Sequence, residues 1–131
     1  MLQQRPNFVL LCQKYPELDA CVIKRRRSGD VISSTIPVFD FKDEHVLRTL
    51  TTVLFKDEFN LDVVLPHDRL TPPLPNRVNY LRWLSVLLNS SAGTVSNNST
   101  RSSPHILDIG VGASCVYPLL GHRMYGWQFT G

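Results

Sequence analysis

The chain has 131 residues, which fits one ordinary domain, and its 43% hydrophobic and 19% charged residues exclude wholesale disorder and a collagen-like fibre. The net charge is +3, and residues 1–42 carry seven Lys or Arg against four acids, whereas residues 43–131 carry seven of each. No apolar run approaches the roughly 18 residues that span a bilayer, and residues 8–12 are too few for a signal-peptide core, so we expect an intracellular protein without a membrane anchor.

The first third of the chain predicts a short helix followed by a β-hairpin. Residues 8–15 carry apolar side chains that can line a helix, which should stop before Pro16 because proline disfavours helical geometry in the residue before it. Residues 28–30, Ser-Gly-Asp, are a turn signal between the apolar residues 21–23 and 31–32. This order favours a hairpin.

Four consecutive basic residues lead into the tip of that hairpin: Lys24, Arg25, Arg26 and Arg27. They account for much of the basic excess in the first third, so a polyanion would be attracted there. A solvated strand or loop explains a short basic run equally well, and both readings stay open at this point.

The middle of the chain predicts two helices joined by an extended connector. The first helix opens at Asp43, and its apolar residues recur at the spacing of one helical face as far as Leu54. Residues 61–65 alternate enough to be a short strand, and residues 66–75 contain four prolines, which predicts an extended connector. Asn76 can cap the second helix, which is apolar nearly all round and is therefore expected to lie between two layers.

The polar stretch that follows predicts a flexible loop. Residues 90–104 are dominated by Ser, Asn, Thr and Gly, and they show no apolar periodicity. We therefore expect the loop to separate the second helix from the segment that begins at His105.

Cysteines and histidines give no sign of a disulfide framework or a metal centre. Cys12, Cys21 and Cys115 are an odd number without metal-ligand spacing, which suits a reducing compartment and predicts small buried apolar side chains. The four histidines are scattered one by one, so no metal site is predicted.

Residues 105–114, His-Ile-Leu-Asp-Ile-Gly-Val-Gly-Ala-Ser, form the segment that carries chemistry. An apolar run ending at Asp108 and followed by Gly-x-Gly predicts a strand, a tight turn and a helix start, with Ser114 as the helix cap. Gly110 permits backbone angles closed to other residues, and Gly112 leaves out a side chain where a ligand approaches the backbone. The helix start offers unpaired N–H groups.

A lone Gly-x-Gly has another explanation, because a strand-to-helix turn can need glycine for geometry alone. The dinucleotide fingerprint requires a third glycine where this chain has Cys115, and the phosphate-binding P-loop would need Gly-Lys-Ser/Thr. An acid before Gly-x-Gly is the form shared by methyltransferases that bind S-adenosylmethionine, and this stretch favours that interpretation.

Three blocks in register resemble the methyltransferase-like protein 16 family of RNA adenine-N6 methyltransferases, which is related to bacterial large-subunit ribosomal RNA methyltransferases. Residues 108–121 are similar to the family's cofactor loop, and residues 75–83 are similar to its Pro-x-Arg-x-Asn-Tyr-x-x-Trp segment. The third block is Lys-Tyr-Pro at 14–16, Phe-Lys-Asp at 41–43 and Leu-Pro at 65–66. The match covers nearly the whole chain.

The resemblance implies an α/β fold, in which a helix-rich RNA-binding module precedes a Rossmann-like methyltransferase domain. It implies S-adenosyl-L-methionine as cofactor and RNA as partner. Carried over by position, the cofactor-binding residues are Arg77, Asp108, Gly110, Gly112 and Ser114. The residues facing RNA phosphates are Lys24, Arg25, Arg26, Arg27 and Arg82. This sequence departs from the family by extra residues around 25–34 and by the composition of its Ser/Asn-rich loop.

The predicted organisation is an N-terminal RNA-binding module and helical cover at 1–89, a flexible loop at 90–104, and the start of the Rossmann-like domain at 105–131. In the family, a second strand ends in an acid that holds the ribose, and a later Asn-Pro-Pro-Phe grips the target adenine. Only residues 124–130 correspond to that second strand, and neither the acid nor the tetrapeptide occurs in this chain. We therefore expect an N-terminal fragment without catalytic residues, inactive alone.

The interpretation adopted is a portion of an S-adenosylmethionine-dependent adenosine-N6 methyltransferase acting on structured RNA, such as U6-like small nuclear RNA or messenger RNA hairpins. A nuclear location follows from the resemblance, with the cytoplasm as a second compartment. The alternative is a non-catalytic RNA-binding module, since the basic excess is present and the catalytic tetrapeptide is not. A third reading is an unstable fragment with no function of its own.

Overall fold

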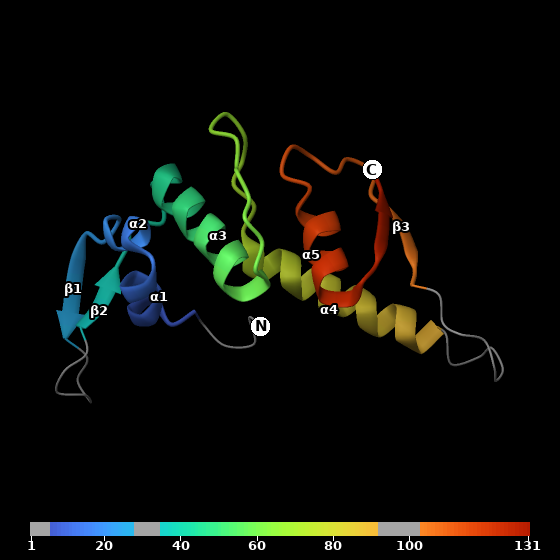
Figure 1. Ribbon diagram of the computed structural model, residues 1–131, viewed down its shortest axis with the longest axis horizontal. Helices are drawn as coiled ribbons and strands as arrows, with labels where there is room; N and C mark the ends of the chain where they lie inside the picture. The colour runs from blue at the N-terminus through green and yellow to red at the C-terminus, as the bar shows by residue number, and fades with distance from the viewer. Residues whose placement is uncertain (1–5, 28–34, 92–102) are drawn as a thin grey trace. The chain divides into compact units, whose positions relative to one another are not determined.

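The computed structural model describes residues 6–27, 35–91 and 103–131, which pack as two compact units, Met1–Thr71 and Pro72–Gly131. Figure 1 colours the helices and strands in chain order. The first unit contains α1 Phe8–Lys14, α2 Pro16–Asp19, β1 Lys24–Arg27, β2 Thr35–Val38 and α3 Glu44–Phe59. The second unit contains α4 Leu74–Ser91, β3 His105–Leu107, α5 Val116–Tyr125 and β4 Gln128–Thr130.

The predicted N-terminal helix is confirmed as α1. The Asn7 side chain caps it by accepting a hydrogen bond from the Leu10 N–H at 3.2 Å. Tyr15 then takes an extended conformation, and Pro16 opens the short helix α2, where its missing N–H costs nothing. The end of α1 and the residue after it contact α3 through one carboxylate: Asp57 accepts hydrogen bonds from Lys14 Nζ at 2.5 Å and from Tyr15 Oη at 3.2 Å.

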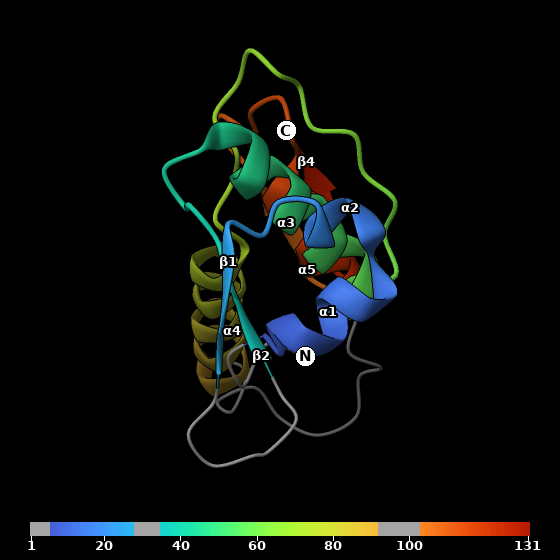
Figure 2. The ribbon, with the colours of Figure 1, turned by 90° about the vertical axis from the view of Figure 1, so that its left-hand side faces the viewer.

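The predicted hairpin forms with a different first strand. The expected strand at residues 21–23 precedes β1, and the basic run itself is the strand, paired antiparallel to β2 with Lys24 opposite Val38 and Arg27 opposite Thr35. Figure 2 shows the two strands side by side. The expected turn and second strand, residues 28–32, lie outside the described residues, so the place of the basic run at a tip stays a prediction.

Helix α3 forms where the sequence predicts it. The Asp43 carboxylate accepts a hydrogen bond from the His45 N–H at 2.8 Å, which satisfies one of the free donors of the first turn. The helix ends at Asn60, whose left-handed φ of 52° lets the next N–H reach back to the Phe55 carbonyl. Phe55 is fully buried, as is Leu18 of α2, so α3 carries the core of this unit.

The predicted strand at residues 61–65 is wrong. The segment has no regular secondary structure and belongs to no sheet of the described residues, although its side chains alternate from Val64, which is 96% exposed, to the buried Leu65. Alternating burial shows which side chains pack on a core, and it does not require a neighbouring strand.

In the second unit, α4 begins earlier than predicted and buries a narrower face. Asn76 is the third helical residue instead of the cap, because Pro75 fits within the first helical turn and lets the helix start at Leu74. Leu74, Val78 and Leu81 are buried, whereas other large apolar side chains of α4 are exposed: Tyr80, Trp83, Val86, Leu87 and Leu88. The expected position between two layers is therefore not observed among the described residues.

The rest of this unit is a strand–helix–strand arrangement. β3 and β4 pair in parallel with Ile106 opposite Phe129, and α5 forms the connection between them, as parallel strands require. A Cβ on Gly121 would lie 2.5 Å from the Phe129 ring, so this glycine permits close packing of helix on strand. The predicted second strand at residues 124–130 is too long, because α5 continues to Tyr125 and β4 keeps only three residues.

The cysteines differ in their environments. Cys12 is buried as expected, whereas Cys21 is half-buried and Cys115 is exposed. The expectation of buried cysteines is wrong for Cys115, which belongs to the turn between β3 and α5 instead of to a core-facing helical position.

Candidate functional site

The predicted cofactor loop lies between the end of β3 and the start of α5. Its first residue, Asp108, extends the pairing of the strands, because its N–H donates to the Thr130 carbonyl at 2.8 Å. One carboxylate oxygen of Asp108, Oδ2, is buried and has no hydrogen-bond partner among the described residues. A buried acceptor without a partner is costly in a folded protein, so this oxygen is suited to a ligand that donates a hydrogen bond.

Both glycines of the loop adopt a backbone conformation that favours glycine. Gly110 has a φ of +85° and Gly112 a φ of +69°, the left-handed region that other residues seldom adopt. A Cβ on Gly110 would meet nothing within 4 Å, and one on Gly112 would meet only the Gly110 carbonyl oxygen at 4.0 Å. The loop therefore exposes its backbone to open space, and neighbouring side chains do not fill it.

The expected helix cap at Ser114 is wrong. The residue before α5 is Cys115, which is left-handed with a φ of 44° and makes no side-chain capping bond. The third helical residue is Pro118, which has no N–H for a cap to bind. Ser114 is half-buried in the turn one residue earlier, so the capping function predicted for it does not exist, while its place in the cofactor loop stays a prediction.

Arg77 lies near the start of α4 and contacts a residue that the sequence analysis did not single out. Its Nη1 donates a hydrogen bond to the Tyr117 hydroxyl at 2.8 Å, and its guanidinium carbon is 5.3 Å from the centroid of the same ring. The Arg77 Nε is buried without a partner among the described residues. Tyr117 is the second residue of α5, so the contact connects Arg77 to the helix that follows the cofactor loop.

The predicted RNA-facing residues fall in both units. Lys24 is exposed at the start of β1, and the side chains of Arg25, Arg26 and Arg27 lie outside what the structure describes. Arg82 is half-buried on α4 in the other unit, and its carbonyl accepts a hydrogen bond from the Ser85 hydroxyl at 2.8 Å. The predicted RNA-facing residues therefore belong to two different compact units.

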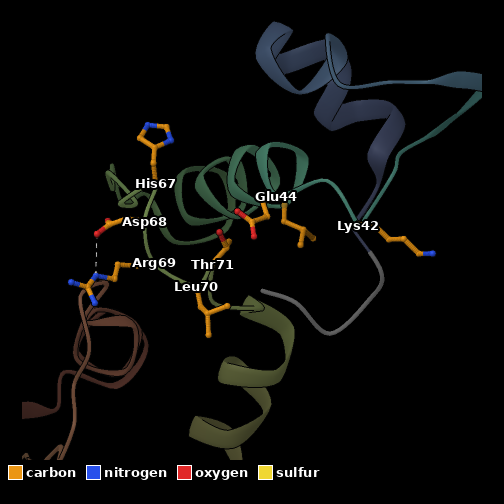
Figure 3. A pocket seen from close by; sticks show the side chains of 8 residues that line it. Lys42, Glu44, His67, Asp68, Arg69, Leu70 and Thr71 are labelled. Atoms are coloured by element: carbon orange, nitrogen blue, oxygen red, sulfur yellow. Dashed lines mark ion pairs between the residues drawn. The ribbon is translucent and has the colours of Figure 1, made fainter.

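A groove of about 510 Å³ in the first unit was not predicted from the sequence. The start of α3 and the connector after residue 66 line it with Lys42, Glu44, Leu47, His67, Asp68, Arg69, Leu70 and Thr71. Figure 3 shows the ion pair of Arg69 with Asp68, 3.5 Å long, and a Lys42 side chain that points away from the others. Acids and bases alternate along the groove, so it presents no field of one sign.

The described residues lack two features, a helix that could cross a membrane and a cluster of metal ligands. No helix among them has both the length and the apolar character needed to cross a membrane. Within the same ranges, no three or more His, Cys, Asp or Glu side chains gather in a way that could hold a metal ion.

Comparison with known proteins places the whole chain in one group. A family model described as RNA methyltransferase matches residues 2–131. The RNA N(6)-adenosine-methyltransferase mettl16 of Danio rerio is 40% identical over 124 residues, which are 95% of this chain and 23% of the relative. The U6 small nuclear RNA (adenine-(43)-N(6))-methyltransferase of Dictyostelium discoideum is 36% identical over 129 residues, which are 96% of this chain and 21% of the relative.

The solved structures that match this chain include domains of METTL16, in agreement with the sequence relatives. The N-terminal domain of human METTL16 in complex with SAH matches with a TM-score of 0.74 at 34% identity, covering 98% of this chain and 45% of that one. The hMettl16 catalytic domain in complex with MAT2A 3′UTR hairpin 6 matches with a TM-score of 0.73 at 32% identity, covering 96% and 39%. The predicted α/β fold class is confirmed as a partial methyltransferase fold. The chain spans about a fifth of the length of these curated relatives.

Proposed function

Since this chain belongs to the RNA methyltransferase family, we propose that its gene product transfers a methyl group from S-adenosyl-L-methionine to N6 of adenosine in structured RNA. The observation that carries the proposal is the loop between β3 and α5. It combines two left-handed glycines facing open space with a buried carboxylate oxygen that has no partner. A turn kept for geometry alone would not need that unpaired oxygen.

The residues of this loop fit the proposed cofactor. Gly110 and Gly112 leave room for a ligand beside the backbone, and Asp108 offers an acceptor to a donor group such as an amine. Ser114 and Arg77 complete the proposed set, Arg77 through the donors of its guanidinium. When bound, S-adenosylmethionine supplies an electrophilic methyl group on its sulfonium. The relative solved with SAH, the demethylated form of this cofactor, supports the assignment.

We propose that RNA is the partner and that phosphates meet Lys24, Arg25, Arg26, Arg27 and Arg82. The support is the run of four cations, the exposure of Lys24, and a relative solved with an RNA hairpin. The proposed organisation remains an RNA-binding module and helical cover at 1–89, a loop at 90–104, and the start of the methyltransferase domain at 105–131. The relative that methylates U6 small nuclear RNA favours a nuclear location, with the cytoplasm as second compartment.

The chain's own contribution to catalysis is positioning. No Asn-Pro-Pro-Phe occurs among its 131 residues, so it offers no group from that motif to hold the adenine amine. Methyl transfer depends mainly on holding the amine and the methyl group near attack distance, and the loop and the basic residues would fix one reactant each. We therefore expect the 131 residues alone to transfer no methyl group.

A direct test incubates the full-length gene product with S-adenosylmethionine labelled in its methyl group and with a hairpin RNA, followed by nucleoside analysis. Label in N6-methyladenosine is the expected result, and the 131-residue chain run in parallel should give none. RNA binding without S-adenosylhomocysteine binding or label would reject the proposal in favour of a non-catalytic RNA-binding module. That alternative has its own support, because four arginines and one acid are present in residues 72–131.

A further inference from the structure

The contact between Arg77 and Tyr117 has two components. The tyrosine hydroxyl accepts a hydrogen bond from Arg77 Nη1 at 2.8 Å, and the guanidinium carbon lies 5.3 Å from the centre of the tyrosine ring. A hydrogen bond alone leaves a guanidinium free to turn about the bonded atom. Contact with the ring as well restricts that rotation, because the cation is attracted to the aromatic side chain.

Tyr117 is itself held by both helices of its unit. It is the second residue of α5, and its ring packs on Tyr80 of α4 with centroids 5.3 Å apart and planes at 59°, a favourable tilted arrangement. Tyr80 is one helical turn after Arg77 on α4, so Tyr117 contacts the same stretch of α4 at two places. Its position is therefore set by packing, independently of any ligand.

The Arg77 guanidinium has hydrogen-bond donors that Tyr117 does not use. Nη1 is used by Tyr117, whereas Nε is buried and has no partner among the described residues. A buried N–H without an acceptor is unfavourable, and the acceptor that fits a guanidinium best is a planar anionic group such as a carboxylate. Among the parts of S-adenosylmethionine, the amino-acid end carries a carboxylate.

We propose that Tyr117 is a positioning residue, which holds the Arg77 guanidinium so that its remaining donors meet the carboxylate of the cofactor. This inference rests on the proposed function, because it assumes that S-adenosylmethionine is bound. Tyr117 does not touch the reacting atoms. It acts through Arg77, and removing its hydroxyl should affect only ligands that carry the carboxylate.

The test compares two ligands by calorimetry on the full-length gene product. S-adenosylhomocysteine carries the amino-acid carboxylate, and 5′-methylthioadenosine lacks the whole amino-acid end. Tyr117→Phe keeps the ring and removes the hydroxyl, so S-adenosylhomocysteine should bind about fivefold to tenfold more weakly, the size of one net hydrogen bond. The affinity for 5′-methylthioadenosine should stay within about twofold. Arg77→Met should cost more, and the double variant should lose no more than Arg77→Met alone.

Tyr125→Phe is the matched control, since it makes the same change at the other end of α5, where the ring stacks on Trp127 at 4.7 Å. It should leave both affinities unchanged. Equal weakening of both ligands by Tyr117→Phe, or losses that add in the double variant, would give Tyr117 a general structural function and overturn the inference while leaving the proposed function intact. A parent protein that binds neither ligand would overturn both.

Discussion

Gly112→Val should remove cofactor binding without unfolding the protein, because its side chain would fill open space beside the loop backbone. The backbone at Gly112 has a φ of +69°, and an added Cβ would meet only one carbonyl oxygen at 4.0 Å. The Cβ itself overlaps no atom, so the cost to the fold is mainly backbone strain, about 1–2 kcal/mol for a residue with a side chain in this region. A domain stable by about 5–15 kcal/mol survives that loss.

The chain contains a matched control for the strain. Gly126 ends α5 with the same φ of +69°, and a Cβ there would meet nothing within 4 Å. Gly126→Val should consequently lower the melting temperature about as much as Gly112→Val does. Only the substitution in the cofactor loop should also lower the affinity for S-adenosylhomocysteine, because the valine side chain occupies the space beside the backbone that the ligand needs. Gly110→Val, at a φ of +85°, should behave like Gly112→Val.

Calorimetric titration and thermal melting of the three valine variants decide the matter together. Equal cofactor affinity in Gly112→Val and Gly126→Val would show that the loop does not contact the cofactor. A melting temperature far lower in Gly112→Val than in Gly126→Val would contradict the strain argument, since both positions are equally open in the structure.

Changing Lys24–Arg27 to alanine should reduce the slope of log affinity for RNA against log salt by up to about three. The control Lys56→Ala should leave the slope unchanged, because Lys56 already lies 3.0 Å from Asp62. An unaltered slope in the first variant would mean that the run is only solvated. Ser114→Ala should leave the melting temperature unchanged, because no capping bond is lost, and a clear drop would contradict the structure. The hydrogen bond with Asp57 raises the pKa of Lys14 above 10.5. The contribution of this bond to stability should therefore be complete below pH 10.5 and disappear as the pH rises through the raised pKa. Chemical unfolding of Lys14→Met should lack that pH dependence.

The elements that the sequence predicted well have local causes. Helix α3 follows from apolar spacing and from an acid at its start, and Asp43 is indeed the cap. The order strand, glycine turn and helix after His105 was also predicted, because left-handed turns strongly favour glycine. These features depend on residues a few positions apart, so the sequence contains them directly.

The errors have equally physical causes. Apolar alternation at residues 61–65 predicted a strand, but a strand needs a partner, and pairing is not a local property. Ser114 was predicted as a cap from its residue type, whereas the helix starts one residue later than that assignment required, after a left-handed Cys115. Tyr117 was missed because its partner Arg77 is 40 residues away and no spacing rule joins them.

The net charge is distributed differently when it is counted by compact unit. By sequence, the basic excess lies in residues 1–42, but residues 1–71 as a unit carry ten basic and ten acidic side chains, and residues 72–131 carry four arginines and one acid. The Lys24–Arg27 run is therefore a local cluster in a neutral unit, and beyond about 8 Å at physiological salt its field is screened. Such a cluster acts on phosphates that touch it, which sets the salt slope of binding. The net charge of +3 on residues 72–131 is screened over the same distance. Changing all four residues to alanine takes residues 1–71 from neutral to a net charge of −4, so both the salt slope of the equilibrium and the rate of association with RNA should fall. Stopped-flow mixing beside equilibrium titration measures the two quantities, and an unchanged association rate would contradict this reasoning.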